Sequence, residues 1–360
     1  MTPLRVLVAG LDHYHVTGWV ETLGLFPDEL EIVALFDPDA AVGAALRPRF
    51  VDPSLPVALP AAFRDLPFST DLDGLLIEQR PDIALVTMAD RDAPAVIERL
   101  ARAGVHMVID KPAALTSAAA RRAFDAVRDH GVRTVVGLTR RYSPSARAAR
   151  ELIAEGRLGT LVTAEAIFAT SSVRVREPAN HLFDPDRSAG GILAWLGIHD
   201  LDTLPWLIGE PVVEVSAMTA RRGDPSLRVE DVSIVALRFA GGVLAALQDS
   251  YALPARGYRT RFAIRGMEAS VELGPGEALT VVTAGDDGMT RDETTRFDEP
   301  DVPGYGAGGQ AAVADLLAAI REGRDTAASG ELLVGALRLI EAAYRSARER
   351  RVVPVEGAAG

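Results

Sequence analysis

The chain has 360 residues, of which 48% are hydrophobic and 24% charged, a composition typical of a folded globular protein with two domains. Its formal net charge of -12 excludes the basic face that nucleic acid or an anionic membrane would need. The absence of cysteine excludes disulfides, thiolate metal sites and a cysteine nucleophile. With no signal-peptide cleavage site and no membrane-length apolar run, we expect a cytoplasmic protein that acts on a small molecule.

Lysine occurs only at Lys111, so 38 minus 1, or 37, of the basic residues are arginines. An arginine guanidinium stays protonated at any working pH, whereas a lysine ammonium can lose its proton when it is desolvated. The single lysine is therefore a candidate for chemistry that arginine cannot perform. A lysine that survived by chance on a solvated face is the alternative that composition leaves open.

The first 138 residues alternate short apolar runs with segments of helical spacing. We expect strands at Leu4–Ala9, Glu31–Phe36, Pro67–Ser69, Asp82–Met88, His106–Ile109 and Arg133–Gly137. We expect helices from Val16 to Phe26, up to Ala103, and from Ala118 to Asp129. Apolar strands separated by helices indicate a doubly wound parallel sheet of the Rossmann type, whose ligands bind at the carboxyl ends of the strands.

The pattern changes after Leu138. Helices are expected at Ser143–Glu155, from Gly190 to Ile208, at Gln310–Glu322 and at Glu331–Arg348. Strands are expected at Leu161–Thr170, Val212–Ala220, Asp231–Phe239, Val243–Tyr251, Tyr258–Ile264, Ala269–Leu273 and Leu279–Thr283, and residues 285–309 suggest a long surface excursion. The prediction is an α/β protein: a Rossmann domain at 1–138, then an α+β domain with a large, mainly antiparallel sheet at 139–360.

The first strand ends at Gly10, where a dinucleotide fingerprint would place glycines at positions 10, 12 and 15. Gly10 permits the tight turn, and the next helix offers its N-terminal N–H groups to a pyrophosphate. Asp12 would repel a phosphate unless it points away, whereas His13 or His15 could donate to one. An ordinary turn without a nucleotide is the alternative, and we expect no metal because the histidine pair lacks an obvious third ligand.

Asp37 follows the second strand. An acidic residue at this place accepts hydrogen bonds from the adenosine ribose hydroxyls and repels a 2′-phosphate, which favours NAD over NADP. A turn or helix-capping role for Asp37 is the alternative.

Lys111 directly follows the fifth strand, so it emerges at the sheet edge where ligands bind, and Pro112 biases its backbone toward an extended conformation. In the second domain, helical spacing places Trp195, His199, Asp202 and Trp206 on one face. A histidine near a carboxylate is suited to proton transfer, whereas a core aromatic stripe with the histidine satisfied by Asp202 is the alternative.

Four segments are similar, in order and spacing, to the motifs of one family. Ala103–Pro112 (AGVHMVIDKP) is similar to Ala-Gly-Lys-His-Val-…-Glu-Lys-Pro, Val136–Tyr142 (VGLTRRY) to Val-Gly-…-Asn-Arg-Arg-Phe, residues 190–209 to Gly-Gly…Gly-x-His-x-x-Asp…Trp-Leu-x-Gly, and Glu341–Ser346 to the last helix. The chain thus resembles the glucose–fructose oxidoreductase and inositol dehydrogenase family (Gfo/Idh/MocA) over nearly its whole length. The resemblance implies that Lys111 lies by the nicotinamide and the substrate hydroxyl, and that His199 acts as acid and base.

Three residue choices depart from that family. Trp195 stands where many of its dehydrogenases carry an aspartate, four residues before the histidine. Asp110 replaces a glutamate, and the glycine fingerprint is broken after Gly10. The family also includes NAD-dependent glycosidases and regulators that bind ligand without turnover.

The resemblance implies NAD-dependent oxidation of a secondary alcohol on a sugar, inositol or related polyol. The open face expected of a large antiparallel sheet also predicts a homodimer or homotetramer. The expected catalytic residues are Lys111, His199 and Asp202; the expected cofactor contacts are Gly10, Leu11, Asp12, His13, His15, Asp37, Met88, Ala89, Asp110, Lys111 and Arg141; the expected substrate contacts are Tyr142, His181, Arg187, Trp195, His199 and Asp200, with Trp195 as an apolar wall for a sugar. A non-catalytic sensor on the same scaffold, and NAD-assisted glycoside cleavage or elimination, are the alternatives.

Overall fold

The chain divides into two compact units. The computed structural model describes residues 2–44, 63, 65–171, 181–224, 226–254 and 257–357. One unit comprises Met1–Thr139 and Pro300–Leu333, and the other comprises Arg140–Glu299 and Val334–Gly360. Pro300–Leu333, which the sequence analysis placed in a second domain at 139–360, thus joins the N-terminal unit, because its helix α9 (Gly306–Glu322) packs against α1, β5 and β6 of that unit.

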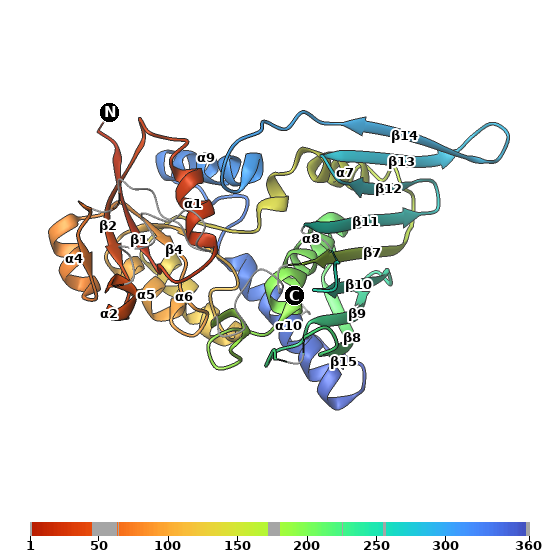
Figure 1. The fold of residues 1–360 in the computed structure, drawn as a ribbon. Helices are drawn as coiled ribbons and strands as arrows, with labels where there is room; N and C mark the ends of the chain where they lie inside the picture. The colour runs from red at the N-terminus through yellow and green to blue at the C-terminus, as the bar shows by residue number, and fades with distance from the viewer. Residues whose placement is uncertain are drawn as a thin grey trace. The chain divides into compact units, whose positions relative to one another are not determined.

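The N-terminal unit is built on a six-stranded sheet in the order β3-β2-β1-β4-β5-β6 (Figure 1). All of its strand pairs are parallel, which confirms the doubly wound Rossmann arrangement. Its strands are β1 (Leu4–Ala9), β2 (Leu30–Phe36), β3 (Phe68–Ser69), β4 (Ile83–Val86), β5 (His106–Ile109) and β6 (Thr134–Val136), and its helices besides α9 are α1 (His15–Leu23), α2 (Ala40–Ala44), α4 (Leu72–Gln79), α5 (Ala93–Arg102) and α6 (Ser117–Asp129).

The strands of this unit read as continuous apolar runs because helices cover both faces of the sheet. Val6, Leu7 and Val8 are fully buried although their side chains point to alternate faces. Among the helices, α6 begins at Thr116, whose side-chain oxygen accepts the N–H of Ala119. The carboxyl ends of the parallel strands consequently form one edge, which carries Gly10, Asp37, Asp110 and Lys111 in its loops.

The C-terminal unit contains a nine-stranded sheet in the order β14-β13-β12-β11-β7-β10-β9-β8-β15 (Figure 1). The pair β10/β7 is parallel and the other pairs are antiparallel, as the sequence predicts. Buried and exposed residues alternate along β9 and β10, so one face of the sheet packs inward. Its strands are β7 (Leu161–Thr170), β8 (Val212–Ala220), β9 (Val232–Phe239), β10 (Leu244–Ser250), β11 (Tyr258–Gly266), β12 (Ser270–Gly274), β13 (Ala278–Ala284), β14 (Thr290–Arg296) and β15 (Val353–Pro354).

Helices α7 (Pro144–Ala154) and α8 (Ile198–Ile208) pack on this sheet, α7 on β12 and β13 and α8 on β7, and the long α10 (Glu331–Glu349) begins in the N-terminal unit and continues in the C-terminal one. The predicted surface excursion at 285–309 is wrong, because this stretch contains the edge strand β14 and the start of α9. All residues of β14 are exposed, which removes the apolar alternation that would have revealed a strand. Within the described ranges, no helix combines the length and the apolar character needed to cross a membrane.

Candidate active site

Gly10 closes β1 in a conformation that only glycine adopts easily. Its φ is +93°, and a Cβ atom there would lie 2.4 Å from the carbonyl oxygen of Thr87, at the end of β4. The Thr87 hydroxyl donates to the carbonyl oxygen of Gly10 at 2.6 Å. The carboxyl ends of β1 and β4 are therefore joined by this hydrogen bond, and the backbones of Gly10 and Thr87 approach each other closely because Gly10 has no side chain.

Asp37 fastens the same turn to the end of β2. Its carboxylate accepts the N–H of Leu11 at 2.9 Å and the N–H of Asp39 at 3.0 Å. Burial raises the pKa of Asp37, against the lowering effect of those two N–H groups. The turn role that the sequence left open is thus present, and each carboxylate oxygen keeps a second lone pair for a ribose hydroxyl.

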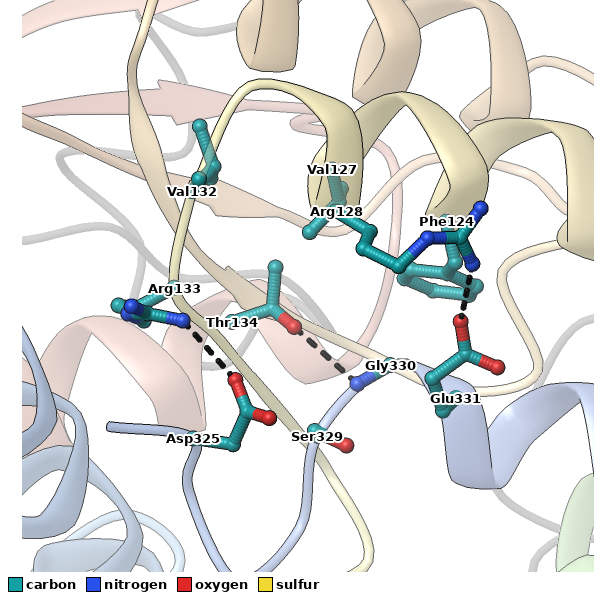
Figure 2. Close-up of a pocket in the computed structure, with 11 residues that line it drawn as sticks. Phe124, Val127, Arg128, Val132, Arg133, Thr134, Asp325, Ser329, Gly330 and Glu331 are labelled. Carbon is teal, nitrogen blue, oxygen red and sulfur yellow. Dashed lines mark hydrogen bonds and ion pairs between the residues drawn. The ribbon is translucent and has the colours of Figure 1, made fainter. Parts of the chain in front are cut away.

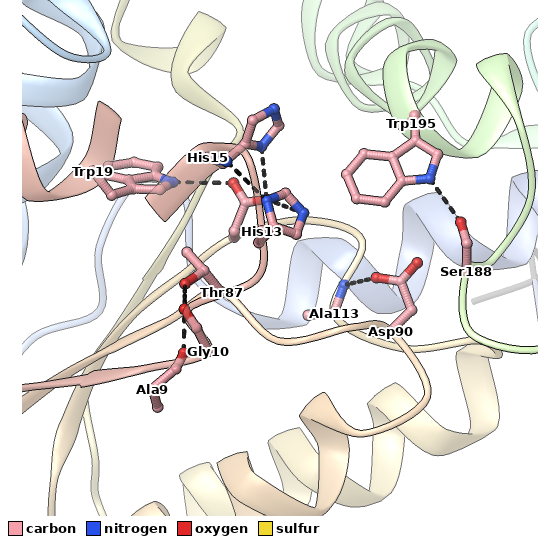
Figure 3. A network of polar contacts seen from close by, with 11 residues as sticks. Ala9, Gly10, His13, His15, Trp19, Thr87, Asp90, Ala113, Ser188 and Trp195 are labelled. Carbon is pink, nitrogen blue, oxygen red and sulfur yellow. Dashed lines mark hydrogen bonds and ion pairs between the residues drawn. The ribbon is translucent and has the colours of Figure 1, made fainter. Parts of the chain in front are cut away.

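Asp110 stands at the centre of a polar cluster after β5. His15 Nδ1 lies 2.8 Å from Asp110 Oδ2, His13 Nε2 lies 3.6 Å from the same oxygen, and Trp19 Nε1 donates to Oδ1 at 3.0 Å. Figure 3 shows the side chains of His13, His15 and Trp19 converging from the first turn and α1. Burial works to raise the pKa of Asp110, but the nearby His15, His13 and Lys111 outweigh it and hold that pKa well below its usual range.

Both histidines of the first turn therefore face Asp110. The sequence analysis considered that either His13 or His15 could donate to a phosphate, and this stays a prediction. His13 is 2% exposed and the His15 side chain is 17% exposed. The ligand atoms of His13, His15 and Asp110 all lie within 4.8 Å of one another, a separation that one metal ion could span. The third residue that the sequence analysis lacked for such a set is thus Asp110, brought from β5 by the fold.

Lys111 is buried, with only 3% of its surface exposed. Its segment is held from two sides: Asp90 accepts the N–H of Ala113 at 3.1 Å, and a Cβ on Gly137, after β6, would lie 3.7 Å from Lys111 Cγ. The Lys111–Pro112 peptide bond is cis. Met88 and Ala89, between β4 and Asp90, are buried in the same loop. The lone lysine is thus enclosed in a fixed loop, and the solvated-face alternative is wrong.

The Gly190–Gly191 pair of the C-terminal unit makes room for a buried carboxylate. A Cβ on Gly190 would lie 1.9 Å from the hydroxyl of Tyr344, and one on Gly191 would lie 2.0 Å from the carbonyl oxygen of Glu230. The Glu230 carboxylate accepts the N–H groups of Gly191 and Leu193 and, at 2.6 Å, the Tyr344 hydroxyl. Glu230 thereby satisfies the start of the helix that leads to His199.

That helix begins as a π-helix at Leu193–Gly197 and continues as α8. Trp195 lies in the π-helical turn, is 2% exposed, and donates from its indole to the Ser188 hydroxyl at 2.7 Å (Figure 3). The position of the Trp195 indole is thus held by a hydrogen bond within its own unit, and its expected role as an apolar wall for a sugar stays a prediction. His199 follows in the first turn of α8 and is half-buried. Short π-helical turns are frequent at functional sites.

The acids of α8 pair with arginines. Asp202 receives two parallel hydrogen bonds from Arg141, at 2.9 and 2.7 Å. Asp200 is fully buried and paired with Arg140. Arg141, expected at the cofactor, and Asp200, expected at the substrate, are thus both engaged inside the C-terminal unit.

The remaining substrate candidates have varied surroundings in the same unit. Tyr142 and His181 are buried, and Arg187 is half-buried. The guanidinium of Arg147 lies 5.2 Å from the centre of the Tyr142 ring. The expected contacts of Tyr142, His181 and Arg187 with a substrate stay predictions.

Two cavities lie away from the carboxyl edge of the Rossmann sheet. One, of about 180 Å³, is lined by α6, the start of β6 and residues 325–331, where Arg133 pairs with Asp325 and Thr134 accepts the N–H of Gly330 (Figure 2). The other is lined by Leu4, Asp82 and His106 at the amino ends of the strands. Neither cavity contains a residue expected to take part in the chemistry.

Several supporting residues were not found from the sequence, among them Trp19, Asp90, Gly137, Glu230 and Asp249. Each acts on a partner more than ten positions away in the chain, so no local pattern marks it. Glycine directly after a strand was the one available signal, at Gly137.

Comparison with known proteins shows the family of the chain. An oxidoreductase-family model for the NAD-binding Rossmann fold matches residues 4–138, and a model for the GFO/IDH/MocA C-terminal domain matches residues 146–272. Inositol 2-dehydrogenase of Rhizobium meliloti (strain 1021) is 31% identical over 285 residues, covering 78% of this chain and 83% of that protein.

Solved structures show the same fold. An oxidoreductase domain protein from Kribbella flavida has a TM-score of 0.82 at 24% identity, covering 99% of this chain and 100% of that one. Levoglucosan dehydrogenase in complex with NADH and levoglucosan has a TM-score of 0.81 at 19% identity, covering 98% and 99%. The resemblance carried by Ala103–Pro112 is thus confirmed, and the chain belongs to the Gfo/Idh/MocA family of NAD(P)-dependent oxidoreductases.

Proposed function

We propose that this protein oxidises a secondary alcohol of a sugar, inositol or related polyol and passes the hydride to NAD. The observation that carries the proposal is the single lysine, Lys111, buried in a fixed loop at the carboxyl edge of the Rossmann sheet. The relative from Rhizobium meliloti, named inositol 2-dehydrogenase, supports the substrate class.

The residues at the first turn fit a dinucleotide. A Cβ at Gly10 would collide with the end of the neighbouring strand at Thr87, so glycine permits the tight turn that leads into α1. Asp37, at the end of β2, would accept the adenosine ribose hydroxyls and repel a 2′-phosphate, so we propose NAD as the cofactor in preference to NADP. When bound, the nicotinamide supplies the hydride acceptor.

In this proposal Lys111 hydrogen-bonds the reacting oxygen and stabilises the alkoxide as its charge develops. Burial favours this role, because a cation acts more strongly on a developing anion where water is excluded. His199 takes the hydroxyl proton, the role that its place in the family motif implies. Asp202 is proposed as a positioning residue in place of a catalytic one, since Arg141 occupies both of its oxygens.

The test is the variant Lys111→Met, which keeps most of the side-chain volume and removes the ammonium. We expect NADH formation from myo-inositol, levoglucosan and a panel of aldoses to fall at least about 100-fold, since electrostatic stabilisers of an oxyanion contribute at this level. The exposed Arg102→Met on α5 is the matched control and should keep full activity. Circular dichroism would show that both variants fold, and full activity of Lys111→Met would overturn the proposal.

Burial of Trp195, at the position where the family resemblance implies an aspartate, favours one second candidate, a non-catalytic sensor of cofactor or ligand. Calorimetry separates the two. Tight binding of NAD without turnover of any polyol would support the sensor, and no binding of NAD or NADH at millimolar concentration would overturn both. Cleavage of a nitrophenyl glycoside without net NADH formation would indicate glycoside cleavage.

A further inference from the structure

The loop after β4 makes hydrogen bonds to two other loops at the carboxyl edge of the Rossmann sheet. At its start, the Thr87 hydroxyl donates to the carbonyl oxygen of Gly10, in the turn after β1, at 2.6 Å. At its end, Asp90 accepts the backbone N–H of Ala113, which follows Lys111 by two residues, at 3.1 Å. Figure 3 shows both contacts. One short loop thus connects the turn expected at the dinucleotide with the segment that carries the only lysine.

Two hydrogen bonds hold the backbone on either side of Lys111. Before it, the N–H of Asp110 donates to the carbonyl oxygen of the last residue of β4 at 2.8 Å. After it, the N–H of Ala113 donates to Asp90. Only Lys111 and Pro112 lie between these two contacts, and the ring of Pro112 fixes its own φ. The direction in which the Lys111 side chain leaves the backbone is therefore set from both ends.

The contact with Asp90 holds Ala113 in a conformation that is costly for alanine. The φ of Ala113 is +60°, in the left-handed region that residues other than glycine disfavour. Ala113 is 4% exposed and Asp90 is 2% exposed, so their hydrogen bond is shielded from water. Without an acceptor at position 90, the buried N–H would lose its partner and the strained φ would lose its support.

The Lys111 side chain is enclosed as closely as its backbone. Gly137, after β6, packs beside it, and a Cβ at Gly137 would lie 3.7 Å from Lys111 Cγ and 3.2 Å from Asp110 Oδ1. Lys111 itself is 3% exposed. Because the side chain has so little free space, a displacement of its backbone also displaces the ammonium.

We propose that Asp90 is a positioning residue for Lys111: by holding Ala113, it fixes the backbone from which the only lysine extends. This role rests on the proposed function, in which the Lys111 ammonium stabilises the developing alkoxide. A displacement of about 1 Å in such a group can lower a rate by roughly 10²-fold, so one hydrogen bond that holds the segment is enough for a large effect on turnover.

The position of Lys111 is tested first, without any reaction. Lys111 has the only side-chain amine of the chain, so acetylation of the native full-length protein by an N-hydroxysuccinimide ester reports on it directly. Peptide mass spectrometry separates this product from acetylation of the amino terminus. We expect Asp90→Leu to raise the acetylation rate of Lys111 roughly tenfold, because the loss of a buried hydrogen bond shifts a local opening equilibrium by about that factor.

Asp90→Asn separates the hydrogen bond from the charge. It removes the carboxylate charge and keeps an oxygen that accepts the Ala113 N–H, so Lys111 should be acetylated as slowly as in the wild type. Asp92→Leu, at the partner of Arg91 in the same loop, is the matched control and should also leave the rate unchanged. A slow rate in Asp90→Leu, or a rate in Asp90→Asn as fast as in Asp90→Leu, would overturn the proposal.

Ala113→Gly shows whether Asp90 acts through the strained residue. Glycine adopts a left-handed φ easily, so the loss of Asp90 should matter less when position 113 is glycine. We expect Asp90→Leu to raise the acetylation rate by a smaller factor in the Ala113→Gly chain, and an equal factor in both chains would overturn the proposal. Circular dichroism checks the fold of each variant, and Asp90→Ala replaces Asp90→Leu in every comparison if the leucine variant does not fold.

Kinetics then test the effect on turnover. We expect kcat for polyol oxidation to fall roughly 10–100-fold in Asp90→Leu, while calorimetry gives a Kd for NAD within a few-fold of that of the wild type. Asp90→Asn should recover most of kcat, and Asp92→Leu should keep it. A loss in Asp90→Leu that lies wholly in NAD affinity would overturn the positioning role. A wild type that oxidises no polyol would overturn the proposed function, whereas the acetylation rates decide separately whether Asp90 holds Lys111.

Discussion

The surroundings of two buried aspartates shift their pKa values in opposite directions. Asp110 has three nitrogen groups around it and a pKa held below its usual range. Asp249, on β10, is fully buried beside Asp200, and burial together with the Asp200 charge raises its pKa well above the ordinary value. Because Asp200 is paired with Arg140, the pKa of Asp249 is raised further than that of Asp200, so a proton shared by the two carboxyl groups is favoured on Asp249.

Asp249→Asn should therefore be well tolerated, because an amide N–H replaces the carboxylic acid O–H. The folded pKa of Asp249 is raised, so its contribution to stability is full below its unfolded pKa of about 4 and is lost as pH rises toward the folded value. We expect the variant to remove this loss, so its free energy of unfolding should decline less than that of the wild type between about pH 4 and 7. Urea unfolding at several pH values measures this, and an unchanged pH slope would contradict the assignment.

Asp200→Asn is the informative partner variant. It removes the charge that Arg140 faces and leaves that half-buried guanidinium over Phe262, 4.4 Å from the ring centre. Breaking one side of a buried ion pair is costly, so this variant should be much less stable than Asp249→Asn.

At the scale of elements, the start of the helix that carries His199 depends on Glu230. That carboxylate precedes β9 in the chain and accepts N–H groups from Gly191 and Leu193, which no residue of the helix itself satisfies. The positions 190 and 191 require glycine because Tyr344 and Glu230 occupy the space that side chains there would need. The sequence marks the glycines, but only the fold shows what they accommodate.

Glu230→Gln should lower the free energy of unfolding of the C-terminal unit by about 1–3 kcal/mol, because the charge is removed and one of its two acceptor oxygens becomes an N–H donor that faces the existing donors. Glu214→Gln on β8, an exposed partner of Arg238, is the matched control and should change stability by less than about 1 kcal/mol. Chemical denaturation followed by tryptophan fluorescence compares them. Equal stability of the two variants would show that Glu230 does not hold the helix start.

At the scale of the whole molecule, one face of the nine-stranded sheet carries exposed apolar side chains. Met218 on β8 and Ile234 on β9 are cross-strand neighbours and are 70% and 46% exposed. Exposed apolar groups that adjoin on a broad sheet are typical of a surface that another chain covers. We propose that this face forms the contact of a homodimer or homotetramer.

The double variant Met218→Asp and Ile234→Asp places two charges on that face and should shift the assembly toward monomer. Light scattering coupled to size-exclusion chromatography measures the mass. Met289→Asp, on the exposed turn before β14, is the control and should leave the mass unchanged. An assembly of unchanged mass in the double variant would place the contact elsewhere.

The sequence by itself determined the doubly wound unit, the mainly antiparallel sheet, the family, and Lys111 as the distinctive residue. These follow from local signals: apolar runs, glycines at strand ends, and short motifs whose spacing survives substitution. Local signals did not predict the strand β14, because an exposed edge strand has no apolar face. They also did not predict that Pro300–Leu333 belongs to the N-terminal unit, because that depends on long-range packing.

Only the tertiary structure decided which charged groups pair with each other. Asp202 lies three residues from His199 and yet pairs with Arg141, and Asp110 lies 95 positions from His15 and yet fixes its ring. The physical reason is that a buried charge must be compensated by whatever donor the packed elements bring within hydrogen-bond distance, and this choice does not depend on closeness in sequence. Lys111 was recognisable from composition, whereas the contact between His15 and the buried carboxylate of Asp110 required the fold.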